Sequence, residues 1–209
     1  MGSSASREYA ESFGVEDQAL TGARNRSEEF GCEPVGPAAG NALRFLAATL
    51  DARAVVEVGT GTGVSGLWLL AGMRSDGVLT SVDTEAEHQR AARQSFREAD
   101  IATTRTRLIN GAALDVLPRL TDGAYDLVFV DGPKSQYHDC LSEALRLLRP
   151  GGVIVFAGAL GRGRVGEPSA RDPETVALRD TIKAVREHEE LVAVVIPLGE
   201  GLLAAVHRP

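Results

Sequence analysis

Short runs of β-branched residues alternate with segments of helical apolar spacing from residue 53 onward. The runs are 53–58, 77–82, 105–109, 126–130 and 152–157, and helix-period segments lie between them at 63–72, 84–99, 112–118 and 136–148. Helices that separate short strands imply right-handed βαβ crossovers. The pattern therefore predicts an α/β fold with a doubly wound, mostly parallel sheet.

The C-terminal pattern differs from this alternation. A helix-period segment at 173–189 is followed by two apolar runs, 191–197 and 201–207, with only Leu198, Gly199 and Glu200 between them. So short a connection permits only a hairpin. We therefore expect the last two strands to be antiparallel to each other.

The N-terminal part precedes the alternation and is mostly polar. Residues 7–28 indicate one or two helices, a breaker cluster follows at 33–37, and Leu43, Leu46 and Leu50 have helical spacing within a segment of about 38–50. We predict an N-terminal helical extension or lid at 1–33 and one main domain at 34–209. The chain has no internal repeat and no linker that would divide it further.

Charge and composition narrow the function classes. The chain has 209 residues and a formal net charge of −7, which opposes a broad contact with nucleic acid. No stretch approaches the roughly 20 apolar residues of a membrane span. Cys32 and Cys140 match no metal spacing, so we expect reduced thiols in a cytoplasmic protein.

Lysine is scarce in this chain, since the 22 basic residues comprise twenty arginines and only Lys134 and Lys183. Arginine does not release its proton at ordinary pH, whereas a desolvated lysine can. Each lysine is therefore a candidate for proton transfer.

Four chemical features are expected at the carboxyl ends of strands, where an open parallel sheet binds its ligand. They are the glycine turn 59–63, Asp83, the turn 110–113 and Asp131. Asp83 follows the second strand, where a carboxylate can bind both hydroxyls of a ribose. The alternative is that Asp83 caps the helix predicted at 84–99. We favour ribose binding, and the two roles are compatible.

The glycine turn does not have the spacing of a nicotinamide-binding motif. Gly59, Gly61 and Gly63 alternate, so the third glycine comes one residue early. Glu57 lies beneath the turn, where its carboxylate would repel a pyrophosphate and attract an ammonium group. These features favour S-adenosylmethionine, which has an adenosine and an amino-acid tail but no phosphate.

Several motifs, taken together, resemble the small-molecule O-methyltransferases of bacteria and of the catechol and caffeoyl-CoA class. The motifs are Glu57-Val-Gly-Thr-Gly-Thr-Gly-Val-Ser65, Asp83, Gly111-Ala-Ala113, Val128-Phe-Val-Asp131-x-x-Lys134-x-x-Tyr137 and Leu148-Arg-Pro-Gly-Gly152. The resemblance runs from about Pro34 to the C-terminus. It implies a seven-stranded, Rossmann-like sheet with an antiparallel last strand, S-adenosylmethionine as cofactor, and a homodimer.

The resemblance also implies roles for single residues. The methionine end of the cofactor would contact the strand and turn at Glu57, Gly59, Thr60, Gly61 and Ser65. Asp83 would bind the ribose, Ala112 and Ala113 would line the adenine, and Val35 would close over the cofactor. Asp131 would lie beside the reactive methyl group, and Lys134 would be the general base. The alternative for Lys134 is a helix-entry cation paired with Asp131, with Tyr137 a packing residue and His138 a surface residue.

One departure from the family pattern concerns metal binding. Metal-dependent members use the aspartate at the position of Asp131 and an Asp-Asn pair after the fifth strand, where this chain has Ala157 and Gly158. One carboxylate is a poor site for Mg²⁺ or Ca²⁺, so we expect no tightly bound metal. We expect the glycine-rich loop 158–171 to be a mobile lid over the acceptor, with Arg162 and Arg164 solvated or meeting an acidic acceptor.

Three interpretations remain open from the sequence. The first is an O-methyltransferase that acts on a small-molecule hydroxyl, which we expect to be phenolic, with Lys134 as base and no tightly bound metal. The second is a catalytically decayed cofactor-binding or dimer-partner protein of the same fold. The third, a methyltransferase acting on RNA or protein, is disfavoured for RNA by the acidic charge.

Overall fold

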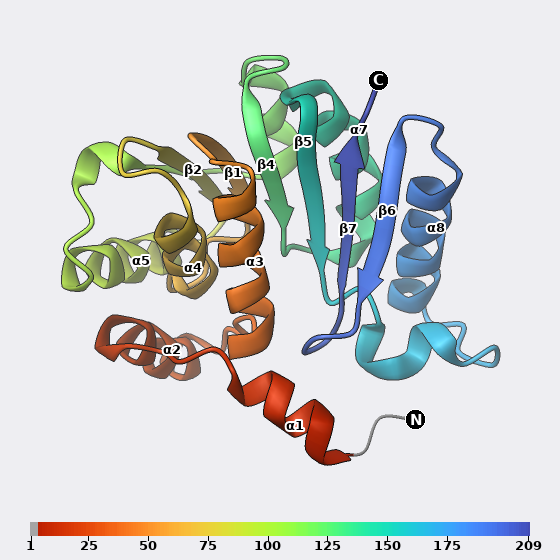
Figure 1. The fold of residues 1–209 in the computed structure, drawn as a ribbon, viewed down its shortest axis with the longest axis horizontal. Coiled ribbons are helices and arrows are strands. Elements are labelled where there is room, and N and C mark those ends of the chain that lie inside the picture. Colours follow the sequence, from red (N-terminus) through yellow and green to blue (C-terminus); the bar gives the residue numbers. More distant parts are fainter. Residues whose placement is uncertain (1–3) are drawn as a thin grey trace.

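The computed structural model describes residues 4–209, so the first three residues of the extension expected at 1–33 lie outside it. The described residues form one seven-stranded sheet in the order β3-β2-β1-β4-β5-β7-β6 (Figure 1). Strands β1 to β5 are parallel, and β7 runs antiparallel to both of its neighbours, β5 and β6. The strands are β1 Ala54–Val58, β2 Val78–Asp83, β3 Thr106–Asn110, β4 Tyr125–Val130, β5 Leu148–Ala157, β6 Leu191–Ile196 and β7 Leu202–His207. The predicted sheet and its terminal hairpin are confirmed.

Helices cover both faces of the sheet. One face packs against α2 Gln18–Phe30, α3 Pro37–Thr49, α4 Val64–Gly72 and α5 Ala86–Glu98. The other face packs against α6 Ala113–Val116, α7 Tyr137–Leu147 and α8 Pro173–Glu187. Helix α1, Ser4–Ser12, packs on α3, and short 3₁₀ turns occur at η1 Thr103–Arg105, η2 Leu117–Arg119, η3 Lys134–Gln136 and η4 Gly161–Gly166. None of the helices in residues 4–209 is both long and apolar enough to cross a membrane.

Local sequence signals explain several of the helix boundaries. The side chains of Asp17 and Asp172 cap α2 and α8 by accepting backbone N–H bonds, and Pro173 begins α8. Gly31 ends α2 in the left-handed conformation. Strand β5 starts earlier than predicted, at Leu148 rather than 152, because a register shift opposite Tyr125 and Leu127 accommodates the Pro-Gly-Gly segment inside the strand.

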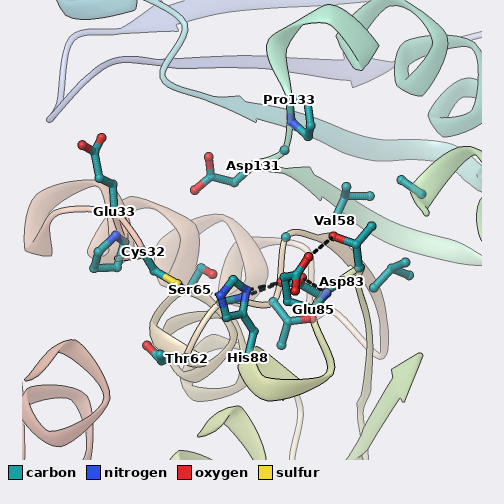
Figure 2. Close-up of a pocket in the computed structure, with 18 of the residues that line it drawn as sticks. Cys32, Glu33, Val58, Thr62, Ser65, Asp83, Glu85, His88, Asp131 and Pro133 are labelled. Atoms are coloured by element: carbon teal, nitrogen blue, oxygen red, sulfur yellow. Dashed lines mark hydrogen bonds and ion pairs between the residues drawn. The ribbon is translucent and has the colours of Figure 1, made fainter. Parts of the chain in front are cut away.

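The carboxyl ends of β1, β2 and β4 meet at one edge of the sheet, and Figure 2 shows the residues around that edge. The amide of Gly59 donates to the carbonyl of Val82 at 2.8 Å, and the amide of Asp131 donates to the carbonyl of Val58 at 2.8 Å. Gly59 has φ +92°, and a Cβ there would lie 2.1 Å from the carbonyl oxygen of Asp131. Only glycine allows this approach, so the turn and Asp131 are held at a fixed separation.

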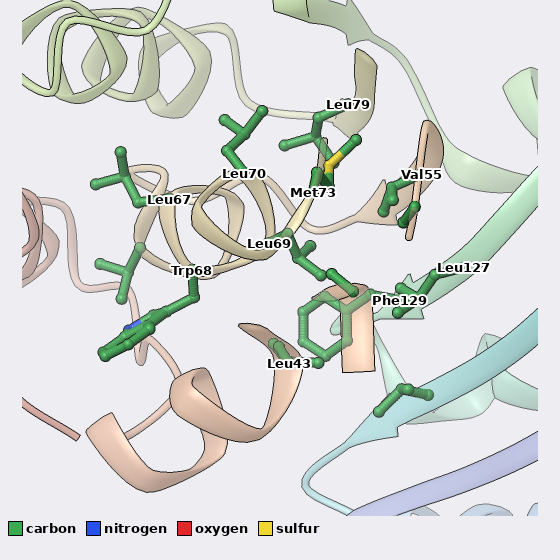
Figure 3. Packing of buried hydrophobic residues seen from close by; sticks show 14 of the residues in the cluster. Leu43, Val55, Leu67, Trp68, Leu69, Leu70, Met73, Leu79, Leu127 and Phe129 are labelled. Carbon is green, nitrogen blue, oxygen red and sulfur yellow. The ribbon is translucent and has the colours of Figure 1, made fainter. Parts of the chain in front are cut away.

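A large apolar core packs around α4, the helix that follows the glycine turn (Figure 3). Trp68 and Leu69 of α4 pack with Leu43 of α3 and with Phe129 of β4, and each is at most 2% exposed. Burial of one such side chain stabilises the fold by about 1.5–3 kcal/mol. The helix that follows the turn is therefore firmly fixed to the sheet.

The N-terminal extension is anchored near the same edge. The Ser27 hydroxyl on α2 lies 2.6 Å from the Thr62 hydroxyl in the glycine turn. Arg26 donates to Ser95 at 2.9 Å and to Glu98 at 2.7 Å on α5. These contacts place the connection between α2 and α3, residues 31–36, beside the carboxyl edge of the sheet.

Candidate functional site

A cavity of about 300 Å³ opens at the carboxyl edge of the sheet (Figure 2). It is bounded by the glycine turn, by the ends of β2 and β4, by the start of α6 and by the connection between α2 and α3. Every residue predicted to bind the cofactor lines it except Glu57: Val35, Gly59, Thr60, Gly61, Ser65, Asp83, Ala112, Ala113 and Asp131.

Glu57 lies beneath the cavity and is fully buried. Its carboxylate accepts the Ser65 hydroxyl at 2.6 Å and the Ser81 hydroxyl at 2.5 Å. Burial raises the pKa of Glu57 to about 7, although the hydrogen bonds from the two hydroxyls act to lower it. Because Ser65 gives its only hydroxyl proton to Glu57, its oxygen is left as an acceptor toward the cavity, which suits an ammonium group.

Asp83 faces the cavity from the end of β2. Its two carboxylate oxygens accept the amides of Gly61 and Glu85, each at 2.9 Å. Helix α5 begins at Ala86 with Glu85 in the N-cap position, so the alternative role of Asp83 as the helix cap is wrong. The two backbone bonds orient the carboxylate and leave further lone pairs for a diol.

Cys32 and His88 belong to the cavity, although the sequence interpretation did not include them. The Cys32 sulfur lies 3.3 Å from Nε2 of His88, whose Nδ1 lies 3.4 Å from the Asp83 carboxylate (Figure 2). Burial, and then the nearby Asp83 charge, raise the pKa of the Cys32 thiol. The only sequence signal for His88 is its place in the first turn of the helix that follows Asp83. No local pattern predicts the role of Cys32, because its contact with His88 crosses 56 residues.

Asp131 lines this cavity from the segment after β4, and Lys134 lies next to Asp131. The Lys134 ammonium is 3.5 Å from the Asp131 carboxylate, 2.6 Å from the Tyr137 hydroxyl and 3.3 Å from the Ala157 carbonyl. Tyr137 is 1% exposed, and its hydroxyl lies 2.9 Å from that same carbonyl. Burial raises the pKa of Asp131, and the Lys134 charge opposes that rise. The pairing of Lys134 with Asp131 is present, and it does not exclude proton transfer.

The residues around Asp131 do not fit a tightly bound divalent metal. Ala157 and Gly158 offer no side-chain oxygen, and a Cβ at Gly158 would lie 3.1 Å from the Lys134 nitrogen. The Lys134 side chain therefore lies where a ligand from position 158 would project. Within residues 4–209, no group of three or more His, Cys, Asp or Glu side chains could hold a metal ion.

A second cavity of about 560 Å³ adjoins the first. The two share Glu33, Pro34, Val35 and Asp131, while Lys134 lines only the second. Asp131 therefore lies between the two cavities, and Lys134 lies beside it on the side of the second.

The glycine-rich segment at the second cavity has local structure that the sequence pattern did not predict. It forms η4, and the Arg179 guanidinium donates to four of its carbonyls, including Val165 at 3.1 Å and Ala170 at 2.7 Å. Arg162 and Arg164 are exposed, as expected. Each also pairs with a carboxylate, Arg162 with Glu33 and Arg164 with Asp172, both at 2.5 Å.

Known proteins resemble this chain along almost its whole length. The family model described as O-methyltransferase matches residues 17–208. A Mycobacteroides abscessus protein named as an O-methyltransferase is 52% identical over 197 residues, which are 94% of this chain and 92% of that protein.

Solved structures agree with the sequence matches. A Corynebacterium glutamicum protein has a TM-score of 0.91 and 33% identity, and the match covers 98% of this chain and 96% of that chain. The O-methyltransferase TomG of Streptomyces achromogenes, crystallised with S-adenosylmethionine, has a TM-score of 0.88 and 28% identity over 98% of this chain and 96% of that chain. By its sequence, its sheet topology and its family match, the chain belongs to the S-adenosylmethionine-dependent O-methyltransferase family.

Proposed function

We propose that this enzyme transfers the methyl group of S-adenosylmethionine to a phenolic hydroxyl of a small molecule, with Lys134 as general base and without a tightly bound metal. The observation that carries the proposal is the place of Lys134. Its amine lines the acceptor-sized cavity and lies 3.5 Å from Asp131, which lines both cavities. A base at that junction is within reach of a hydroxyl held against the methyl donor.

The first cavity fits the cofactor. Ser65 would accept the methionine ammonium, since Glu57 holds its hydroxyl proton. Asp83 would bind the ribose hydroxyls, Ala112 and Ala113 would border the adenine, and Val35 and the rest of the extension would close over the ligand. The cofactor supplies a methyl group on a sulfonium, which an acceptor oxygen attacks in line. The protein supplies positioning and the base.

A phenol suits a lysine base better than an alcohol does. Phenolic hydroxyls have pKa values near 10 and free lysine amines near 10.4, so proton transfer between them is almost balanced. Water, a guide to aliphatic hydroxyls, has a pKa of about 15.7. After transfer, the new ammonium would donate to Tyr137, Ala157 and Asp131, all within 3.5 Å.

A chelator experiment tests the proposal. Purified enzyme with S-adenosylmethionine is given a panel of phenols, with and without EDTA, and the methylated product is measured. We expect turnover that EDTA does not change. Loss of turnover on chelation and its return with Mg²⁺ would contradict the metal-free reaction. Tight binding of S-adenosylmethionine with no turnover on any phenol would favour the decayed alternative, which the missing Asp-Asn pair supports.

We also propose a cytoplasmic homodimer. Strand β6 is at the edge of the sheet, and its side chains Val192, Val194 and Val195 are 58%, 54% and 38% exposed, without a charged residue among them. Such an edge is open to pairing with another chain, and the two free thiols suit a reducing compartment. Light scattering of the purified protein measures the mass, and a monomer at micromolar concentration would contradict the dimer.

A further inference from the structure

His88 lies where three parts of the first cavity meet. It is the third residue of α5, and it lines the cavity together with Asp83 and Cys32 (Figure 2). Its Nδ1 is 3.4 Å from the Asp83 carboxylate, and its Nε2 is 3.3 Å from the Cys32 sulfur. Its ring is nearly perpendicular to that of Phe30 at the end of α2, with the two centroids 6.1 Å apart. His88 therefore contacts both the proposed ribose carboxylate and the end of the N-terminal extension.

The orientation of the Asp83 carboxylate depends on His88. This carboxylate is 9% exposed, and in the part of the chain that the structure describes His88 is its only ion-pair partner. The amide of Gly61 binds one of its oxygens, while the amide of Glu85 and the His88 ring approach the other. Among residues 4–209, His88 is thus the one side chain that acts on the direction of this carboxylate.

The hydrogen-bonding groups from Cys32 to Asp83 form a chain with one direction. A carboxylate only accepts, so Nδ1 of His88 carries the proton that faces Asp83. In the neutral ring, Nε2 is then an acceptor. Burial and the nearby Asp83 charge raise the pKa of the Cys32 thiol, which therefore keeps its proton and donates it to Nε2. A residue of the extension thus helps to fix the ring that orients Asp83.

Cys32 also begins the segment that borders the first cavity. Glu33, Pro34 and Val35 follow it directly and line the same cavity. Val35 is the residue proposed to close over the cofactor, and only two residues separate it from Cys32. The contact between Cys32 and His88 therefore sets where the closing segment lies relative to Asp83.

We propose that His88 is a positioning residue for the cofactor, which orients the Asp83 carboxylate toward the ribose and, through Cys32, couples cofactor binding to closure of residues 31–36. This role rests on the proposed function, because it takes the first cavity as the S-adenosylmethionine site and Asp83 as the ribose ligand. It requires no contact between His88 and the cofactor. It affects affinity and closure rather than the methyl transfer itself.

Calorimetric titration with S-adenosylhomocysteine tests the effect of His88 on affinity. His88→Phe keeps a ring against Phe30 but removes both nitrogens, and we expect it to weaken binding by roughly three- to tenfold, as for one lost hydrogen bond. His88→Asn, whose amide nitrogen can replace Nδ1, should restore most of the affinity. His138→Phe is the matched control at an exposed position on α7 outside both cavities, and it should bind as the wild type does.

A double-mutant cycle shows whether His88 acts through Asp83. In the Asp83→Asn background, His88→Phe should have little further effect, because the carboxylate that the imidazole orients is gone. A loss of affinity in the double variant equal to the product of the two single losses would show that His88 acts independently of Asp83. That result would overturn the positioning role.

Hydrogen exchange of the backbone amides in residues 31–36 tests the coupling to the extension. S-adenosylhomocysteine should slow this exchange in the wild type and in His138→Phe. The slowing should be smaller in His88→Phe and in Cys32→Ala, and it should return in Cys32→Ser, whose hydroxyl can also donate to Nε2. Cys32→Ala leaves His88 in place, so it tests the coupling even where His88→Phe does not fold.

The outcomes separate this role from the function on which it rests. Wild-type affinity in His88→Phe, or equal slowing of exchange in the wild type and Cys32→Ala, would overturn the role of His88 alone. Wild-type affinity in Asp83→Asn would overturn it together with the proposed ribose site. The proposed methyl transfer fails differently, through turnover that needs Mg²⁺ or survives the loss of Lys134.

Discussion

The Lys134 amine lies 2.6 Å from the Tyr137 hydroxyl, and both contact the Ala157 carbonyl, at 3.3 Å and 2.9 Å. Tyr137 has one hydroxyl proton, so when it donates to that carbonyl its oxygen accepts from Lys134. The buried phenol therefore fixes the direction of the lysine side chain toward the second cavity.

Replacing Tyr137 with Phe tests this positioning role. We expect kcat to fall by about tenfold, since displacement of a catalytic group by about 1 Å can cost more than that, while the dissociation constant of S-adenosylmethionine stays the same. The rate is expressed per cofactor-binding site, counted by calorimetry, so that a loss of folded protein is not mistaken for a loss of rate. Tyr125→Phe, a partly buried tyrosine on β4 away from both cavities, is the control. An unchanged kcat per site in Tyr137→Phe would show that Tyr137 does not position Lys134 for the reaction.

The buried carboxyl of Glu57 predicts a pH-dependent stability. Its folded pKa is about 7 and the ordinary value is 4.5, so the folded protein holds this proton more tightly than the unfolded chain does. The stabilisation is complete below about pH 4.5, declines as the pH rises, and is lost above about pH 7. By linkage, the change amounts to roughly 3 kcal/mol.

Urea unfolding at pH 5, 6.5 and 8 measures the effect. The wild-type free energy of unfolding should decline across this range by more than that of Glu57→Gln, which has no proton to lose. Glu29→Gln, at an exposed position on α2, should follow the wild type. Equal pH slopes in the wild type and in Glu57→Gln would show that the buried group does not titrate in this range.

Asp83 should govern cofactor affinity rather than catalysis. A charge-assisted hydrogen bond is worth about 1.5–3 kcal/mol, so Asp83→Asn should weaken binding of S-adenosylhomocysteine by roughly ten- to a hundredfold. Asp115→Asn removes the same charge from an exposed position near the cavity and should leave the affinity unchanged. Calorimetry of both variants checks this, and equal affinities would exclude Asp83 from ribose binding.

The sheet and the cofactor cavity follow from local patterns in the sequence. Buried parallel strands such as β1 need continuous β-branched runs, and glycine is required at Gly59 where the backbone meets Asp131. Both requirements act within a few residues of the chain. They are therefore readable without knowledge of the tertiary structure.

Other features depend on contacts that no local pattern encodes. The pairing of Glu33 with Arg162 crosses 129 residues, and the contact of Cys32 with His88 crosses 56. The backbone carbonyls of the segment at 158–172 accept hydrogen bonds from Arg179, a residue of α8 that a sequence pattern assigns only to an amphipathic helix. Glu57 shows the same limit. The sequence predicted its position beneath the glycine turn, but not its complete burial or its hydrogen bond from Ser65.

The most direct test of the central claim is the turnover of three lysine variants on a phenol that the wild type methylates. Lys134→Ala removes the base, Lys134→Arg keeps the charge but cannot release its proton, and Lys183→Ala changes the other lysine, which is exposed on α8. General-base catalysis is worth about 10²- to 10⁴-fold. We predict that both Lys134 variants lose at least a hundredfold in kcat while binding S-adenosylmethionine normally, and that Lys183→Ala keeps full activity. Wild-type turnover in Lys134→Ala or in Lys134→Arg would contradict the role of Lys134 as the base.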